Sequence, residues 1–170
     1  MNAIPEWTFN DGWILMSVFL TQGVNGASLD EVLGAADVMN HAIPTSGELS
    51  RALTRLASRG ILTEEGDRFR IFATHLPSIA EANQGKSELF GRPDKGKRWL
   101  SRMQFDVDDA IRVSITDEQL ALAFDLYCKR FRQKKLTNKR IHAELPARPV
   151  SNGLSLGGSV AQAMFAAYFL

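Results

Sequence analysis

Apolar side chains recur at helical spacing in three segments of the first sixty residues. The first segment, residues 13–20, is apolar on most sides. Asn10 or Asp11 can cap the start of this helix, because both side chains accept hydrogen bonds from free backbone N–H groups. Gly23 is expected to end it. The pattern therefore predicts a first helix between these two signals.

The second helix has a clear start signal. Ser28 and Glu31 are spaced as a capping box, in which a hydroxyl and a carboxylate satisfy each other's free backbone N–H groups. Apolar residues then recur at helical spacing as far as Met39. Pro44 biases the residue before it away from the helical region, so the chain is expected to break there.

A second capping box follows this break at once. Thr45 and Glu48 predict the start of a third helix, which is expected to stop at Gly60. One side of this helix carries three leucines, namely Leu49, Leu53 and Leu56. Two helices joined by a short turn are therefore expected over residues 28–60.

Beyond Gly60 the period of the pattern changes from 3.6 to 2. Residues 61–62 begin a strand, residues 65–67 have the composition of a hairpin turn, and residues 68–72 alternate between polar and apolar side chains. The predicted order is helix, helix, turn, helix and hairpin.

Over roughly residues 8–75 this order resembles the winged helix-turn-helix superfamily, as used in many small bacterial transcription regulators. The block at residues 35–45 is also similar to one found in short bacterial proteins with no assigned role. The resemblance implies a mainly helical α+β fold, with three helices, a β-hairpin wing and a helical C-terminal extension. It also implies a DNA-binding protein that reads duplex DNA with the helix at 46–59 and the wing at 61–72.

The distribution of charge agrees with that implication. The chain has 20 Lys and Arg against 19 Asp and Glu, so any affinity for nucleic acid must come from local charge. Residues 1–80 carry nine acidic and five basic residues, and all five basic residues lie within residues 51–70. The basic residues of this acidic segment are thus concentrated on the predicted third helix and wing.

Helical spacing puts three arginines within about 80° of one another, opposite the leucines, with Thr54 beside them. Arg is suited to bidentate contact with guanine and pairs well with phosphate. In the resembled fold the wing meets phosphate or the minor groove. The candidate nucleic-acid-binding residues are Arg51, Thr54, Arg55, Arg59, Arg68 and Arg70.

Two other interpretations stay open. Arginines spaced by four residues are also typical of a solvated amphipathic helix, and Glu48 can pair with Arg51. Winged helices also serve as protein-protein interaction modules that bind no DNA, and the acidic hairpin tip at residues 64–67 would repel phosphate. The target sequence, any effector ligand and the direction of regulation are not specified by these patterns.

Residues 76–145 are expected to form a linker and a helical extension. The Gly, Lys and Pro content of residues 84–97 indicates a loop. Thr116 and Gln119 form a third capping box, which predicts a helix of about eighteen residues. Its stripe of large apolar side chains, expected in the core, comprises Leu120, Phe124, Tyr127 and Phe131. Seven of the twelve residues 129–140 are basic. They are expected to form either a phosphate-binding cluster or a solvated end of the helix.

No motif predicts an enzyme. Residues 80–87 satisfy a relaxed phosphate-loop pattern, but no convincing strand precedes them, and Gly91 and Pro93 follow where a helix should run. The three histidines lack partners at metal-ligand spacing. We therefore predict no catalytic residue, no metal site and no cofactor. A single cysteine, Cys128, and the lack of a long apolar span suit a cytoplasmic protein that does not enter a membrane.

The last segment, residues 146–170, is an uncharged apolar tail after Arg148. Residues 159–170 are too few to span a bilayer. Such a tail is expected to be covered by the domain or by a second subunit, and a homodimer through the C-terminal helices is one way to do so. A change of reading frame near residue 145 is the alternative origin of the tail.

Overall fold

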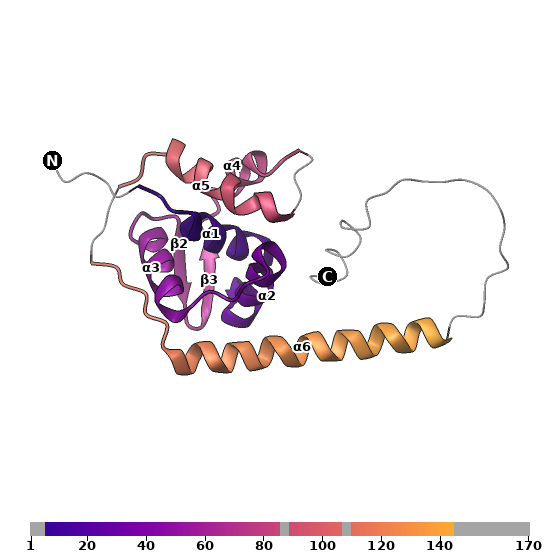
Figure 1. Cartoon of the computed structure of the whole chain (residues 1–170). Helices are drawn as coiled ribbons and strands as arrows, with labels where there is room; N and C mark the ends of the chain where they lie inside the picture. Colours follow the sequence, from indigo (N-terminus) through magenta and orange to yellow (C-terminus); the bar gives the residue numbers. More distant parts are fainter. Residues whose placement is uncertain (1–5, 86–88, 107–109, 145–170) are drawn as a thin grey trace, which may run out of the picture. The chain divides into compact units, whose positions relative to one another are not determined.

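The computed structural model describes residues 6–85, 89–106 and 110–144. Two compact units divide the chain, Met1–Lys129 and Arg130–Leu170, and each is considered by itself. The predicted tail at 146–170 lies outside the described residues. Helices and a small antiparallel sheet make a mainly helical α+β fold (Figure 1).

The described residues form helices and short strands, of which three helices and a hairpin were predicted within residues 8–75. The helices are α1 (Phe9–Thr21), α2 (Leu29–Asn40), α3 (Ser46–Ala57), α4 (Leu76–Ala82), α5 (Arg92–Arg102) and α6 (Asp117–Glu144). The strands are β1 (Ala27–Ser28), β2 (Leu62–Glu65) and β3 (Arg68–Ile71), and a short 3₁₀ turn (Leu89–Gly91) precedes α5. The three predicted helices and the hairpin are confirmed within residues 8–75. This order is compatible with a winged helix.

The sheet has one strand that the sequence pattern did not predict. Its order is β1-β3-β2 with antiparallel pairing throughout, so β3 is the central strand. Phe69 of β3 pairs with Ala27 of β1 on one side and with Glu64 of β2 on the other. β1 has only two residues, too few for an alternating pattern to show in the sequence.

The predicted cap of the first helix is wrong. Thr8, not Asn10 or Asp11, is the N-cap, and its hydroxyl accepts a hydrogen bond from the Asp11 backbone N–H. The Asp11 carboxylate accepts from the Thr8 backbone N–H at 2.7 Å, which completes a capping box. Asp11 therefore occupies the reach-back position of the box, a role in which Glu is more usual.

The other start signals are confirmed. The capping boxes predicted at Ser28 and Thr45 are both formed. Leu49, Leu53 and Leu56 are fully buried, so the predicted leucine side of α3 faces the core. At the start of α6, the Thr116 N–H donates to the Gln119 side chain at 2.9 Å.

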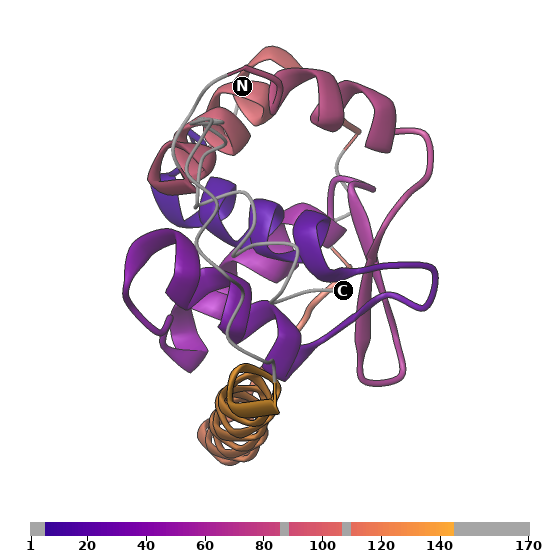
Figure 2. The same ribbon diagram turned by 90° about the vertical axis from the view of Figure 1, so that its right-hand side faces the viewer.

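The expected loop over residues 84–97 is wrong from Arg92 onward, because α5 begins there. Pro93 lies at the start of α5, where its missing N–H costs no hydrogen bond. Gly96 packs against Gly12 of α1 so closely that a Cβ at Gly96 would lie 2.7 Å from the Gly12 carbonyl oxygen. Glycine is required at this crossing for close backbone approach, and both views show α5 beside α1 (Figure 1 and Figure 2).

Helices α4 and α5 thus belong to the same compact unit as residues 8–75. With α5 on one side and α2 and α3 on others, α1 is buried from residue 11 to residue 18. Trp99 of α5 donates its indole N–H to the Ser78 hydroxyl of α4 at 3.1 Å, which ties the two helices together.

The first half of α6 contacts α2. Tyr127 donates its hydroxyl to the Asp37 carboxylate at 2.6 Å, and its ring lies 3.2 Å from a Cβ built on Gly34. Phe124 and Phe131 are 40% and 41% exposed, so the expectation that the whole stripe lies in the core is wrong at both positions. Helix α6 has 28 residues, more than the eighteen or so that were expected. None of the helices described is both long and apolar enough to cross a bilayer.

Replacing Gly12 or Gly96 by Ala is expected to lower the free energy of unfolding by about 1–3 kcal/mol, because backbone atoms occupy the space of the added methyl group. Urea denaturation followed by circular dichroism measures this. Gly47 of α3 is the matched control, since nothing lies within 4 Å of its Cβ position. Gly47→Ala should stabilise the chain by up to about 1 kcal/mol. Equal effects at Gly12 and Gly47 would contradict the close crossing.

Candidate nucleic-acid interface

The predicted interface centres on α3, whose start is held by its capping box. The Glu48 carboxylate accepts from the Thr45 backbone N–H at 2.9 Å and from the Asn10 side chain at 3.0 Å. The backbone hydrogen bond from Thr45 lowers the pKa of Glu48 most, and the Asn10 amide and the nearby Arg51 lower it further. Glu48 thus anchors the start of α3 and places a negative charge near Arg51.

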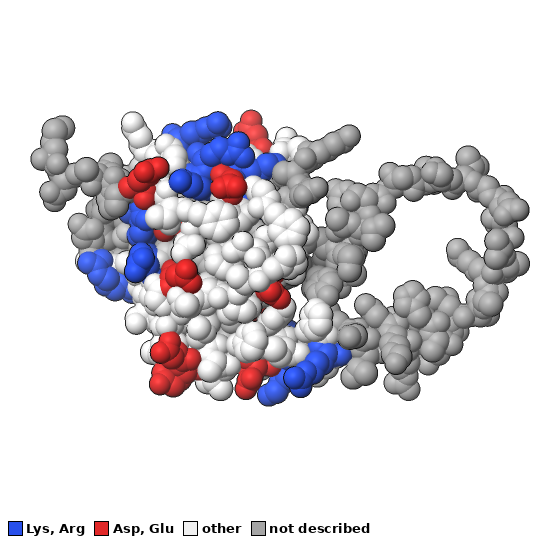
Figure 3. Space-filling view, viewed as in Figure 1, with Lys and Arg blue, Asp and Glu red and all other residues white. Residues whose placement is uncertain are grey.

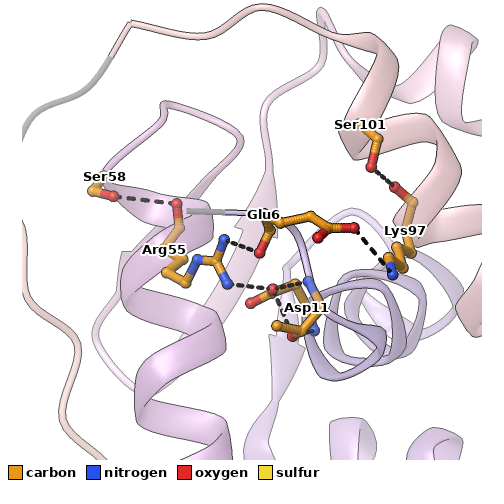
Figure 4. A network of polar contacts seen from close by, with 7 residues as sticks. Glu6, Asp11, Arg55, Ser58, Lys97 and Ser101 are labelled. Carbon is orange, nitrogen blue, oxygen red and sulfur yellow. Dashed lines mark hydrogen bonds and ion pairs between the residues drawn. The ribbon is translucent and has the colours of Figure 1, made fainter. Parts of the chain in front are cut away.

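Arg55, a candidate for groove contact, instead binds the start of α1. Its guanidinium forms an ion pair with Asp11 at 2.7 Å and donates to the Glu6 backbone carbonyl at 3.0 Å (Figure 4). The side chains of Arg55 and Asp11 are 15% and 2% exposed. Since Asp11 also belongs to the capping box of α1, this contact joins the start of α1 to the middle of α3.

Trp7 covers the same side of α3. The guanidinium carbons of Arg55 and Arg59 lie 4.8 and 4.9 Å from its ring centre, within the range of cation–π contacts. Trp7 is itself buried and meets the Phe105 ring edge-on at 6.1 Å. Arg55 and Arg59 therefore both contact the segment that precedes α1.

A second cover lies on the neighbouring side of α3. We name residues 111–116, which run extended beside α3 and lead into α6, the strap (Figure 1). Val113 accepts from and donates to the Thr54 hydroxyl, both at 2.9 Å. Ile115 does the same with the Ser50 hydroxyl at 3.3 and 2.8 Å. Just beyond the strap, Ser46 donates to Asp117 at 2.5 Å.

These contacts form a regular ladder with a geometric basis. Each step of four residues along α3 is about 6 Å of helix rise. Each step of two residues along an extended chain covers about 6.6 Å. The strap runs antiparallel to α3. Every fourth residue of the helix therefore meets every second residue of the extended chain, as the contacts of Ser46, Ser50 and Thr54 show.

The strap has two unlike sides. Val113 and Ile115 are 5% and 7% exposed, whereas Arg112, Ser114 and Thr116 are exposed. The four hydrogen bonds to Ser50 and Thr54 contribute about 0.5–1.5 kcal/mol each, and burial of the two apolar side chains adds to this. The strap is thus held by contacts of moderate strength along one side of α3.

Little of α3 remains open to solvent between these two covers. Among its twelve residues only Gly47 and Arg51 are exposed. Thr54 and Arg55 are half-buried beneath the strap and the segment before α1, respectively. Of the four α3-side candidates, the structure therefore presents Arg51 to solvent most fully.

The two candidates on the wing make contacts of their own. Arg68 donates to the Gly26 carbonyl at 2.5 Å and lies 3.4 Å from the Glu31 carboxylate. Arg70 lies 3.8 Å from Glu65, and both side chains are substantially exposed, which makes this a weak pair. The structure thus places Arg68 toward β1 and α2, and leaves Arg70 on the open surface of the hairpin.

A shallow cleft of about 720 Å³ lies between the end of α3, β2 and the strap. Its lining includes Arg59, His75 and Arg112, but also the carboxylates of Glu64 and Asp106. Burial raises the pKa of Glu64. The cleft is therefore lined by side chains of both charge signs.

Basic side chains also gather outside the predicted interface. Figure 3 shows Lys and Arg over the part of the molecule that α4 and α5 form. The sequence of α5 has five basic residues and one acid, Asp94. Arg98 and Arg102 are exposed, whereas Lys97 lies 3.9 Å from Glu6 and Lys95 donates to the Gln84 carbonyl.

Among the described residues, no three His, Cys, Asp or Glu side chains are placed to hold a metal ion.

Two features of this interface were missed in the sequence. Ser46, Ser50 and Thr54 recur every four residues and form a hydroxyl stripe on α3, and Val113-Ser114-Ile115 alternates as an extended segment does. Each pattern is visible in the sequence. Their pairing is not, because they lie about sixty residues apart.

Comparison with known proteins adds no assignment. No protein-family model, curated protein or solved structure matches this chain. The candidate site is therefore described from its own geometry alone.

Arg55→Ala is expected to lower the free energy of unfolding by about 3–5 kcal/mol, because it leaves the buried Asp11 carboxylate without its cationic partner. Arg51→Ala, at an exposed position of the same helix, should change it by less than about 0.5 kcal/mol. Urea denaturation of both variants compares them directly. A loss at Arg55 as small as that at Arg51 would show that the ion pair does not stabilise the fold.

Proposed function

We propose that the protein is a winged-helix DNA-binding protein of the kind that regulates transcription in bacteria. The order of helices and the β1-β3-β2 sheet support the winged-helix assignment, since they place a third helix beside a β-hairpin. The proposed function assigns α3 to the major groove and the hairpin to the flanking phosphates.

The outward side of α3 carries this proposal. It consists of hydroxyl and guanidinium side chains, the groups that donate hydrogen bonds to bases and phosphates. They are Ser46, Ser50, Arg51 and Thr54, whereas the guanidinium of Arg55 is paired with Asp11. The hydrogen bonds of Ser50 and Thr54 with the strap can be exchanged for contacts with DNA, because a hydroxyl that donates to a carbonyl can also donate to a phosphate oxygen.

Arg51 is the residue best placed for DNA contact. It lies on the exposed strip of α3 and does not take part in the buried ion pair of Arg55. Arg55 is a poorer choice for a binding test, since removing it is expected to weaken the fold itself. Arg98 of α5 is a matched control, because it is also an exposed arginine on a helix and carries the same charge.

A duplex selected from a random pool should bind the protein in a salt-dependent manner, measured by fluorescence anisotropy at about 50 and about 200 mM salt. Arg51→Ala should cost about 1–3 kcal/mol of binding free energy, the range for a lost base contact. Arg98→Ala should cost less than about 0.5 kcal/mol. Equal losses at Arg51 and Arg98 would contradict the assignment of α3 to the groove, and no salt-dependent binding would contradict DNA binding altogether.

A second candidate is a winged-helix protein-protein interaction module. The strap favours it, because α3 already binds the main chain of a polypeptide through Ser50 and Thr54. Leu122 and Leu126, one turn apart on α6, are 66% and 49% exposed and offer an apolar contact surface. For this candidate we expect no DNA binding and a stoichiometric protein complex that Leu122→Glu disrupts. The predicted homodimer is one form such a complex can take.

A further inference from the structure

We propose that the strap is an autoinhibitory cover of α3, so that the strap and duplex DNA compete for the same side of the helix. This inference rests on the proposed DNA-binding function. It concerns residues 111–116 and the α3 hydroxyls that they occupy, all within the unit Met1–Lys129.

The first reason is the width of the major groove. An α-helix with its side chains is about 10–12 Å across, and the major groove of B-DNA is about 12 Å wide. A helix with an extended chain beside it does not fit. Val113 and Ile115 lie within hydrogen-bond distance of Thr54 and Ser50, so the strap is at van der Waals contact with α3 and must leave before the helix can enter.

The second reason is chemical. A hydroxyl has one hydrogen to donate, and the Ser50 and Thr54 hydroxyls donate theirs to strap carbonyls. They also accept from the strap N–H groups, so neither hydroxyl has a hydrogen left to donate to DNA while the strap is bound. Competition follows because one set of atoms serves both partners.

The third reason is that the cover is separable from the core. Leu49, Leu53 and Leu56 are fully buried on the side of α3 that faces the core, whereas the strap binds the polar side through Ser50 and Thr54. Within the strap only the side chains of Val113 and Ile115 are buried, and the residues on either side of each are exposed. We therefore expect release of the strap to expose two apolar side chains and to break four hydrogen bonds, while α3 keeps its leucine contacts with the core.

This arrangement has a measurable consequence for affinity. When only a fraction of molecules has the strap released, the apparent dissociation constant for DNA equals the intrinsic constant divided by that fraction. A variant that releases the strap should therefore bind DNA more tightly than the parent protein. A variant that only removes a DNA contact would bind more weakly, so the direction of the change separates the two roles.

The release variant is Val113→Gln with Ile115→Gln, which places two amides where apolar side chains are buried and leaves the net charge unchanged. Its control is Ile111→Gln with Ser114→Gln, at exposed positions of the same strap. By anisotropy with the selected duplex, the release variant should bind at least about tenfold more tightly than the parent, a difference of about 1.4 kcal/mol. The control should stay within about twofold.

The outcomes separate the cover from the function. If the folded release variant, the control and the parent all bind equally, and Arg51→Ala weakens each, the strap is no inhibitor and DNA binding stands. If none of them binds at any salt concentration, the DNA-binding function fails and the cover fails with it. Tighter binding by the release variant alone supports both.

A second measurement uses the parent protein and so does not depend on the folding of a variant. Amide hydrogen exchange at Val113 and Ile115 should become at least about tenfold faster when saturating duplex is added, because their hydroxyl acceptors are taken by DNA. The Ile71 amide, which donates to the Gln22 side chain at 2.8 Å, is the internal control and should not change. Unchanged protection at Val113 and Ile115 in the DNA complex would overturn the proposal.

Discussion

The buried ion pair between Asp11 and Arg55 is the contact on which the arrangement of α3 depends. Asp11 closes the capping box of α1 and neutralises Arg55 with the same carboxylate oxygen, so the start of one helix is fixed to the middle of another. Because a buried charge is costly without its partner, neither residue can move far alone. The segment before α1, including Trp7, is thereby held against α3.

The other side of α3 is covered by weaker and more regular contacts. Ser50 and Thr54 bind the strap through hydroxyl groups, each of which both donates and accepts. The ion pair and the strap therefore differ in kind. One is a buried charge contact whose loss damages the fold, and the other is a set of neutral hydrogen bonds that another ligand can replace. This difference is why we assign a structural role to Arg55 and a regulatory role to the strap.

Local signals in the sequence were sufficient for much of the fold. Capping boxes at Ser28, Thr45 and Thr116 marked three helix starts, because such boxes depend only on residues three positions apart. The Thr8 box was missed although it has the same spacing, since Asp11 was taken as a cap instead of as the residue that reaches back. Two-residue β1 was too short to show a period.

Non-local packing accounts for the larger errors. Gly96 and Pro93 suggested a loop, but the glycine allows the close approach to Gly12 and the proline starts the helix. Helical spacing correctly separated the leucine side of α3 from its polar side. It did not show whether the polar side meets solvent, DNA or another part of the chain, because that depends on residues 111–116, far along the sequence. The DNA contacts of the six candidate residues stay a prediction.

In the free protein, the strap occupies the polar side of α3 through Ser50 and Thr54. Nuclear Overhauser effects between the strap and α3 measure this contact in solution. We expect cross-peaks from the Thr54 side chain to the Val113 amide and from the Ser50 side chain to the Ile115 amide, in that register. If both are absent and residues 111–116 have random-coil chemical shifts, the strap does not cover α3.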